Sequence, residues 1–73
     1  MPLTMAEIGK TYLISRISGK TEVKRHLENM GFVVEAKVVV VSELAGSLIV
    51  NVKDARVGLG KELAAKIFVT DVI

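Results

Sequence analysis

The chain has 73 residues, which is the length of one small domain, and we treat residues 1–73 as a single folding unit. Hydrophobic residues make up 51% of it, but no run approaches the roughly 20 apolar residues that a membrane helix needs. The lack of cysteine excludes disulfides and thiolate metal sites, and a net charge of +2 is small for a nucleic-acid binder. Without a secretory leader pattern, the sequence predicts a cytoplasmic protein that does not insert into a membrane.

The first predicted elements are a helical turn and a strand. Thr4–Ile8 has the spacing of a capping box, and Gly9 is expected to end this turn. Thr11–Ile17 alternates in the manner of a strand, and we expect Leu13 and Ile17 to point toward the core.

A short amphipathic helix is predicted next, from Thr21 onward. Val23, Leu27 and Met30 recur at i, i+4 and i+7, which places them on one face. Gly31 can adopt the left-handed conformation that commonly ends a helix.

The rest of the chain predicts four more short strands, joined by a glycine hairpin near Gly46, a tight turn at Lys53-Asp54 and a helical turn at Lys61–Ala65. These strands are Ala36–Leu44, Leu48–Val52, Arg56–Leu59 and Ile67–Val72. The expected core residues on them are Val38, Val40, Leu48, Val50, Val52, Val57, Leu59, Ile67 and Val69. The order predicts a mainly β fold, a small five-stranded antiparallel barrel with a short helix inserted between strands 1 and 2, because closure removes exposed edges.

Four apolar side chains have no place inside such a barrel, because side chains alternate along a strand. These outward residues are Val39, Val41, Ile49 and Phe68. Either the N-terminal turn and the helix cover them, or they contact a partner protein, and a homodimer formed through paired strand faces would also use them.

The predicted helix also carries a basic pair, Lys24 and Arg25. One interpretation is a solvated face on which Lys24 pairs with Glu28 and Arg25 pairs with Glu22. A second is a positive patch that meets an acidic protein surface. A nucleic-acid partner is disfavoured, because no aromatic residues alternate with the basic ones to stack on bases.

Chemistry-bearing residues are sparse. His26 is the one histidine, and with Glu22 it forms at most a weak, open candidate metal site beside two positive charges. The two Gly-Lys-Thr triplets lack the upstream glycine of a phosphate-binding loop. We therefore expect no cofactor and no enzymatic activity.

The order of several short motifs resembles the FeoA family, small cytosolic proteins associated with bacterial ferrous-iron uptake. The motifs are Leu3 with Gly9, Ile17-Ser18-Gly19, Lys24-Arg25-His26-Leu27, Met30-Gly31-Phe32, Val57-Gly58-Leu59 and Glu62-Leu63-Ala64. The resemblance implies an SH3-like barrel with an inserted helix. It also implies a non-enzymatic accessory protein that binds and modulates FeoB, a membrane iron transporter with a cytosolic GTP-binding domain.

Two other functions stay open beside this one. A similar domain occurs in iron-dependent repressors, which implies a divalent transition-metal-binding sensor or chaperone as the alternative. A small nucleic-acid-binding barrel is the second alternative.

The chain departs from the family in one segment, Val33-Val34-Glu35-Ala36. Family members usually carry a glycine there, often after a proline. We expect either a different turn type or a non-glycine residue that is strained.

Overall fold

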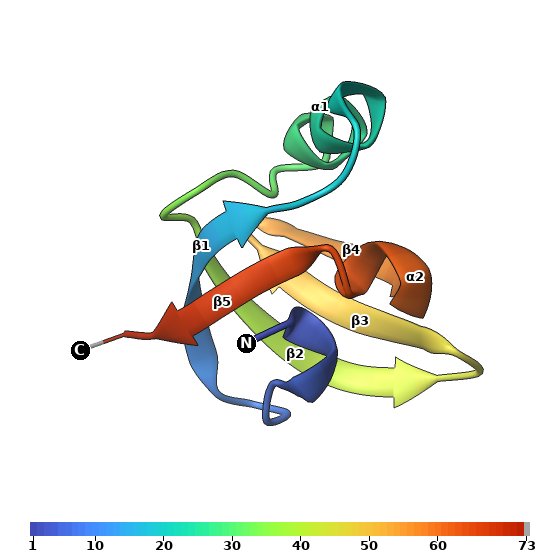
Figure 1. The fold of residues 1–73 in the computed structure, drawn as a ribbon. Helices are drawn as coiled ribbons and strands as arrows, with labels where there is room; N and C mark the ends of the chain where they lie inside the picture. Colours follow the sequence, from blue (N-terminus) through green and yellow to red (C-terminus); the bar gives the residue numbers. More distant parts are fainter. Residues whose placement is uncertain (73) are drawn as a thin grey trace.

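The computed structural model describes residues 1–72 and shows one antiparallel sheet of five strands that curls around a core (Figure 1). The strands are β1 (Thr11–Ile17), β2 (Lys37–Leu44), β3 (Ser47–Val52), β4 (Ala55–Gly60) and β5 (Ile67–Asp71), in the spatial order β4-β3-β2-β1-β5. The helical elements are η1 (Leu3–Met5), α1 (Thr21–Asn29) and α2 (Lys61–Ala64). The predicted mainly β fold is confirmed, with α1 inserted between β1 and β2.

The core is almost entirely aliphatic. Among residues 1–72, no polar or charged side chain is buried, and Tyr12 and Phe32 are the largest buried side chains. Of the core residues expected on strands 2 to 5, all are buried except Val57, which is half-buried and packs against the core. Each buried aliphatic side chain contributes roughly 1.5–3 kcal/mol relative to exposure, so these strands supply most of the stabilisation.

The inward face of β1 differs from the prediction. Tyr12 and Ile14 are buried, whereas Leu13 is only half-buried and pairs with β2 on the outer side of the sheet. A β-bulge between Ile14 and Arg16 shifts the register against β5. The extra residue restores Ile17 to the inner side, where it packs partly against the core. The expectation that Leu13 points inward was therefore wrong.

The N-terminal turn also differs. It is the three-residue 3₁₀ turn η1, which follows Pro2 and has no side-chain cap, so the predicted capping box is absent. The turn begins at the buried Leu3 and ends at Met5, so it lies earlier in the chain than the predicted Thr4–Ile8. Gly9 lies beyond it in a separate turn with φ +87°, where its N–H donates to the carbonyl of Val40.

The predicted glycine end of α1 is confirmed. Gly31 has φ +101°, and its N–H donates to the Glu28 carbonyl at 2.9 Å. The Phe32 N–H donates to the Leu27 carbonyl at 3.0 Å, which completes a Schellman motif. Phe32 and Leu27 are both buried, so this motif attaches the end of α1 to the core.

The turn at Val33–Ala36, where the sequence departs from the family pattern, contains a strained non-glycine residue, which was one of the two expected outcomes. The Ala36 N–H donates to the Val33 carbonyl at 3.0 Å, and Glu35 has φ +73°. This is the third turn position, at which a type II turn requires a positive φ and favours glycine, with proline preferred just before it. Glu35 and Val34 occupy these two positions.

The two hairpins turn over two residues each. Ala45 and Gly46, with φ +49° and +81°, connect β2 to β3, as a type I′ turn requires. Lys53, with φ +55°, begins the turn to β4. Both predicted turns are confirmed.

Candidate functional site

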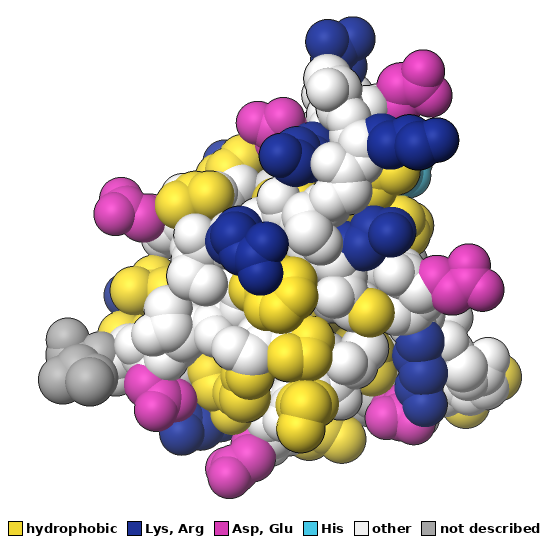
Figure 2. All heavy atoms as spheres, in the orientation of Figure 1, with side chains coloured by type: hydrophobic (Ala, Val, Ile, Leu, Met, Phe, Trp, Pro, Cys, Tyr) yellow, Lys and Arg dark blue, Asp and Glu magenta, His cyan; other side chains and the backbone are white. Residues whose placement is uncertain are grey.

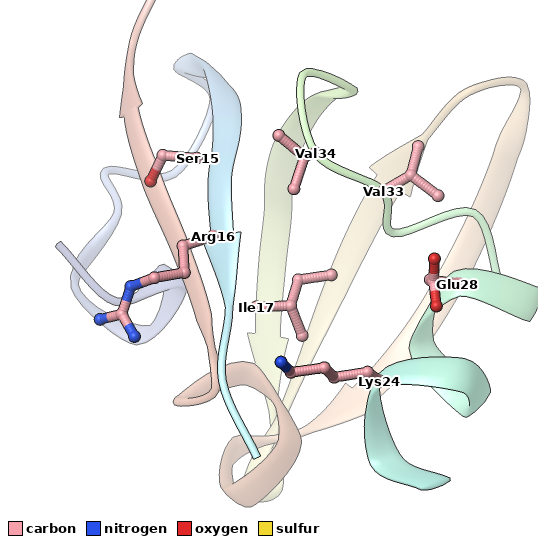
Figure 3. A pocket seen from close by; sticks show the side chains of 7 residues that line it. All are labelled: Ser15, Arg16, Ile17, Lys24, Glu28, Val33 and Val34. Carbon is pink, nitrogen blue, oxygen red and sulfur yellow. The ribbon is translucent and has the colours of Figure 1, made fainter. Parts of the chain in front are cut away.

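A pocket of about 270 Å³ lies between β1, α1 and the turn at residues 33–34 (Figure 3). Cavities that bind small molecules usually hold about 300–1,000 Å³, so this one suits one or two side chains better than a cofactor. The lining residues are Ser15, Arg16, Ile17, Lys24, Glu28, Val33 and Val34.

The pocket combines an apolar interior with a charged rim. Ile17, Val33 and Val34 converge from β1 and the turn, and the Lys24 side chain reaches from α1 toward Ile17 (Figure 3). Arg16 points away over β5, where its guanidinium stacks 4.2 Å from the centre of the Phe68 ring. A guanidinium over an aromatic face is attracted by the ring electrons, which holds Arg16 beside the pocket.

The basic residues of α1, Lys24 and Arg25, form no ion pair with the carboxylates of the same helix. Within residues 1–72, the ion pairs are Lys10–Asp71 at 3.0 Å and Lys61–Glu43 at 2.9 Å. The pairs proposed for Lys24 and Arg25 along the helix are therefore not formed. Both side chains are exposed, and of the two only Lys24 lines the pocket, on the same wall as Glu28.

The Lys10–Asp71 pair links the start of β1 to the end of β5. The hydrogen bond and negative charge of Asp71 raise the pKa of Lys10 above its ordinary value. Both side chains are about half-exposed, so the pair is a surface contact and contributes little stability.

The six residues predicted to bind a partner fall into three groups. Lys24 and Arg25 lie on α1, Phe68 lies on β5, and the other three lie on the outer side of β2 and β3. The last group is Val39, Val41 and Ile49, all half-buried. The outer sides of β5 and of β2–β3 face different directions around the core (Figure 1), so the structure does not bring the six residues together.

The sequence interpretation missed part of the exposed apolar surface. Figure 2 shows apolar side chains in the middle and lower part of one face, with basic side chains above them around α1. The large apolar residues that are exposed are Met1, Met5, Ile8, Val34, Leu44 and Val72. Val33 and Val34 of the pocket were missed as well, since no local pattern indicates that three separate segments meet.

The candidate metal ligands have no third histidine, cysteine or carboxylate beside them in the described part of the chain. His26 and Glu22 are exposed on α1. Across residues 1–72, no three side chains of histidine, cysteine, aspartate or glutamate come close enough to hold one ion. In the same range, no helix has the length and hydropathy to cross a membrane.

A family model of the FeoA domain matches residues 1–71. The chain belongs to the FeoA family. FeoA proteins are accessory proteins of ferrous-iron transport and are not a known enzyme family.

Individual relatives agree with this assignment. A Methanocaldococcus jannaschii protein named as a candidate Fe(2+) transport protein A is 29% identical over 70 residues, covering 96% of this chain and 85% of its own. The crystal structure of an iron uptake regulatory protein, FeoA, has a TM-score of 0.88 and 27% identity, covering 96% of this chain and 93% of its own.

The fold agrees with that of an SH3 domain protein. The Stenotrophomonas maltophilia FeoA, a prokaryotic SH3 domain protein crystallised with zinc, has a TM-score of 0.83 and 21% identity. The match covers 96% of this chain and 89% of the Stenotrophomonas maltophilia chain. The expected SH3-like barrel of this FeoA chain is thus confirmed.

Proposed function

We propose that this FeoA chain is a non-enzymatic, cytoplasmic accessory protein that binds the cytosolic part of an FeoB-like ferrous-iron transporter and modulates transport. The observation that carries the proposal is the apolar pocket beside Lys24, a cation with no ion-pair partner among residues 1–72. An apolar hollow with an unneutralised charge at its rim is suited to a protein partner, because burial gives affinity and charge gives orientation.

The exposure of the charged side chains supports a binding role over catalysis. Enzymes usually tune acids and bases by burying them, and no Asp, Glu, His, Lys or Arg side chain is buried in residues 1–72. The hydroxyl of the buried Tyr12 accepts a hydrogen bond from the Glu7 N–H at 3.0 Å. The names of its relatives, an iron uptake regulatory protein and an Fe(2+) transport protein A, fit an accessory role in iron transport.

The proposal is tested by titrating the folded chain into the purified cytosolic part of the transporter, with heat release as the readout. We expect saturable binding of one molecule per site in the micromolar range. No heat change and no co-elution at tens of micromolar, with the β-sheet circular dichroism signal intact, would reject the proposal.

Two substitutions test the outward apolar surfaces of β5 and of β2 one at a time. Phe68→Asp is expected to weaken transporter binding several-fold, because it removes apolar area and the aromatic face that holds Arg16. Val39→Asp probes the outer side of β2, which we propose contacts the transporter or a second copy of this chain. Both side chains are only half-buried, so both variants should stay folded; unfolding would show that the side chain belongs to the core.

A further inference from the structure

One edge of β1 is unpaired where it borders the pocket. β1 pairs with β5 as far as Ile17, but its ladder with β2 covers only Thr11–Leu13. Two backbone bonds extend that contact, from the Ile14 N–H to Ala36 at 3.0 Å and from the Glu35 N–H to Ile14 at 2.7 Å. Beyond Ile14, no backbone segment within residues 1–72 pairs with this edge.

The backbone groups of Ile17 point toward this open side. The Ser18 N–H donates to the Lys66 carbonyl of the neighbouring chain segment at 2.8 Å. Hydrogen-bonded and non-hydrogen-bonded pairs alternate along an antiparallel ladder, so the pair of Ile17 and Ile67 is a non-hydrogen-bonded one. The N–H and C=O of Ile17 therefore face away from β5, on the side that holds the pocket.

Three features thus meet in one cleft. The strand edge offers a donor and an acceptor, and the pocket offers about 270 Å³ lined partly by Ile17, Val33 and Val34 (Figure 3). Lys24, which forms no ion pair within residues 1–72, lies at the mouth, and Glu28 lines the helix side of the pocket. An extended peptide presents the complementary set: backbone groups, a side chain on one face and a charge nearby.

We propose that this cleft binds an extended acidic segment of the transporter's cytosolic part by strand addition to β1. The segment pairs with the backbone of Ile17, inserts one apolar side chain into the pocket and places a carboxylate against Lys24. Main-chain bonds supply affinity, while the pocket and the lysine select the sequence. This inference rests on the proposed function and assigns the surface that performs it.

Charge reversal at neighbouring helix positions tests the contact with Lys24. In titrations with the transporter's cytosolic part, Lys24→Glu should weaken binding about tenfold, since it replaces an ion pair at a partly desolvated rim with repulsion. Arg25→Glu changes the same charge on the same helix but does not line the pocket, so its affinity should stay within about twofold of wild type. Equal effects of the two variants, or none from Lys24→Glu, would overturn the proposal.

Amide hydrogen exchange tests the strand addition independently of charge. The Ile17 amide should exchange rapidly in the free chain and at least about tenfold more slowly in the complex. The Ser18 amide, already bonded to Lys66, serves as the internal reference that should change little.

The outcomes separate this inference from the function on which it rests. Binding by the wild type with unchanged exchange at Ile17 would overturn strand addition but leave the accessory role standing. Absence of any binding by the wild type would remove both. Protection of Ile17 together with a selective loss in Lys24→Glu would support both.

Discussion

Glu35 occupies a position that suits glycine. Its φ of +73° places an L-residue in the left-handed region, which costs about 1–2 kcal/mol for most side chains. The surrounding contacts hold it there, since its N–H donates to Ile14 and the turn is closed by Val33 and Ala36. The strain lies in the turn that supplies two walls of the pocket.

Glu35→Gly should stabilise the domain by about 0.5–1 kcal/mol, because it relieves that strain at some cost in unfolded-chain entropy. Urea unfolding monitored by circular dichroism measures the change. Glu35→Ala is the matched control, since it removes the carboxylate but keeps the strained Cβ, and it should not stabilise. Equal stabilisation by both variants would assign the effect to charge and not to the backbone.

His26 should contribute little to metal binding. It lies exposed beside Glu22, and no third ligand approaches within residues 1–72. His26→Ala is expected to change the affinity for ferrous or zinc ions by less than about twofold, because two open ligands bind weakly. Calorimetry on both proteins decides the point, and a tenfold loss in the variant would revive the metal-sensor alternative.

Individual residues show which features the sequence could predict. Strain in the turn at residues 33–36 was one of two outcomes expected from the sequence, the other being a different turn type, because family members usually carry a glycine there. The inward face of β1 was not, since alternation assigns Leu13 and Tyr12 equally well until the bulge after Ile14 is known. A bulge adds one residue without changing local composition, so it left no signal in the sequence.

At the level of elements, α1 depends on its C-terminal attachment. Gly31 has φ +101°, and a Cβ there would lie 3.7 Å from the Val52 side chain, so the cost of a substitution is conformational and not steric. The Schellman bonds from Gly31 and Phe32 fix the angle at which α1 leaves the barrel. That angle sets the distance between Lys24 and β1.

Gly31→Ala should therefore destabilise the domain by about 1–2 kcal/mol, measured as a shift in the urea midpoint. Gly58→Ala is the control, because Gly58 lies in β4 without a positive φ and has only ordinary contact space around it. It should change stability by less than about 0.5 kcal/mol. A Gly31→Ala variant as stable as Gly58→Ala would contradict the role given to the helix end.

Strands and helices were largely predictable, while their meeting points were not. The valine run of β2 and the alternation of β3 indicate their buried faces directly, because burial on one side imposes a period of two. The pocket arises from β1, α1 and a turn that are separated in sequence. Its lining depends on the angle of α1, which is a tertiary property. Of the lining residues, therefore, only Lys24 had been predicted to bind a partner.

At the scale of the whole molecule, every charged side chain of residues 1–72 lies outside the core. The surface with the most defined geometry is the cleft between β1 and α1, where an open strand edge, a pocket and Lys24 coincide.

The most direct test of this account is the initial rate of ferrous-iron uptake by cells that produce the transporter with or without this chain. We expect the wild type and Arg25→Glu to change the uptake rate alike, whereas Lys24→Glu, present at the same level, should leave the rate found without the chain. A rate that does not respond to the wild-type chain, or that responds equally to Lys24→Glu, would contradict it.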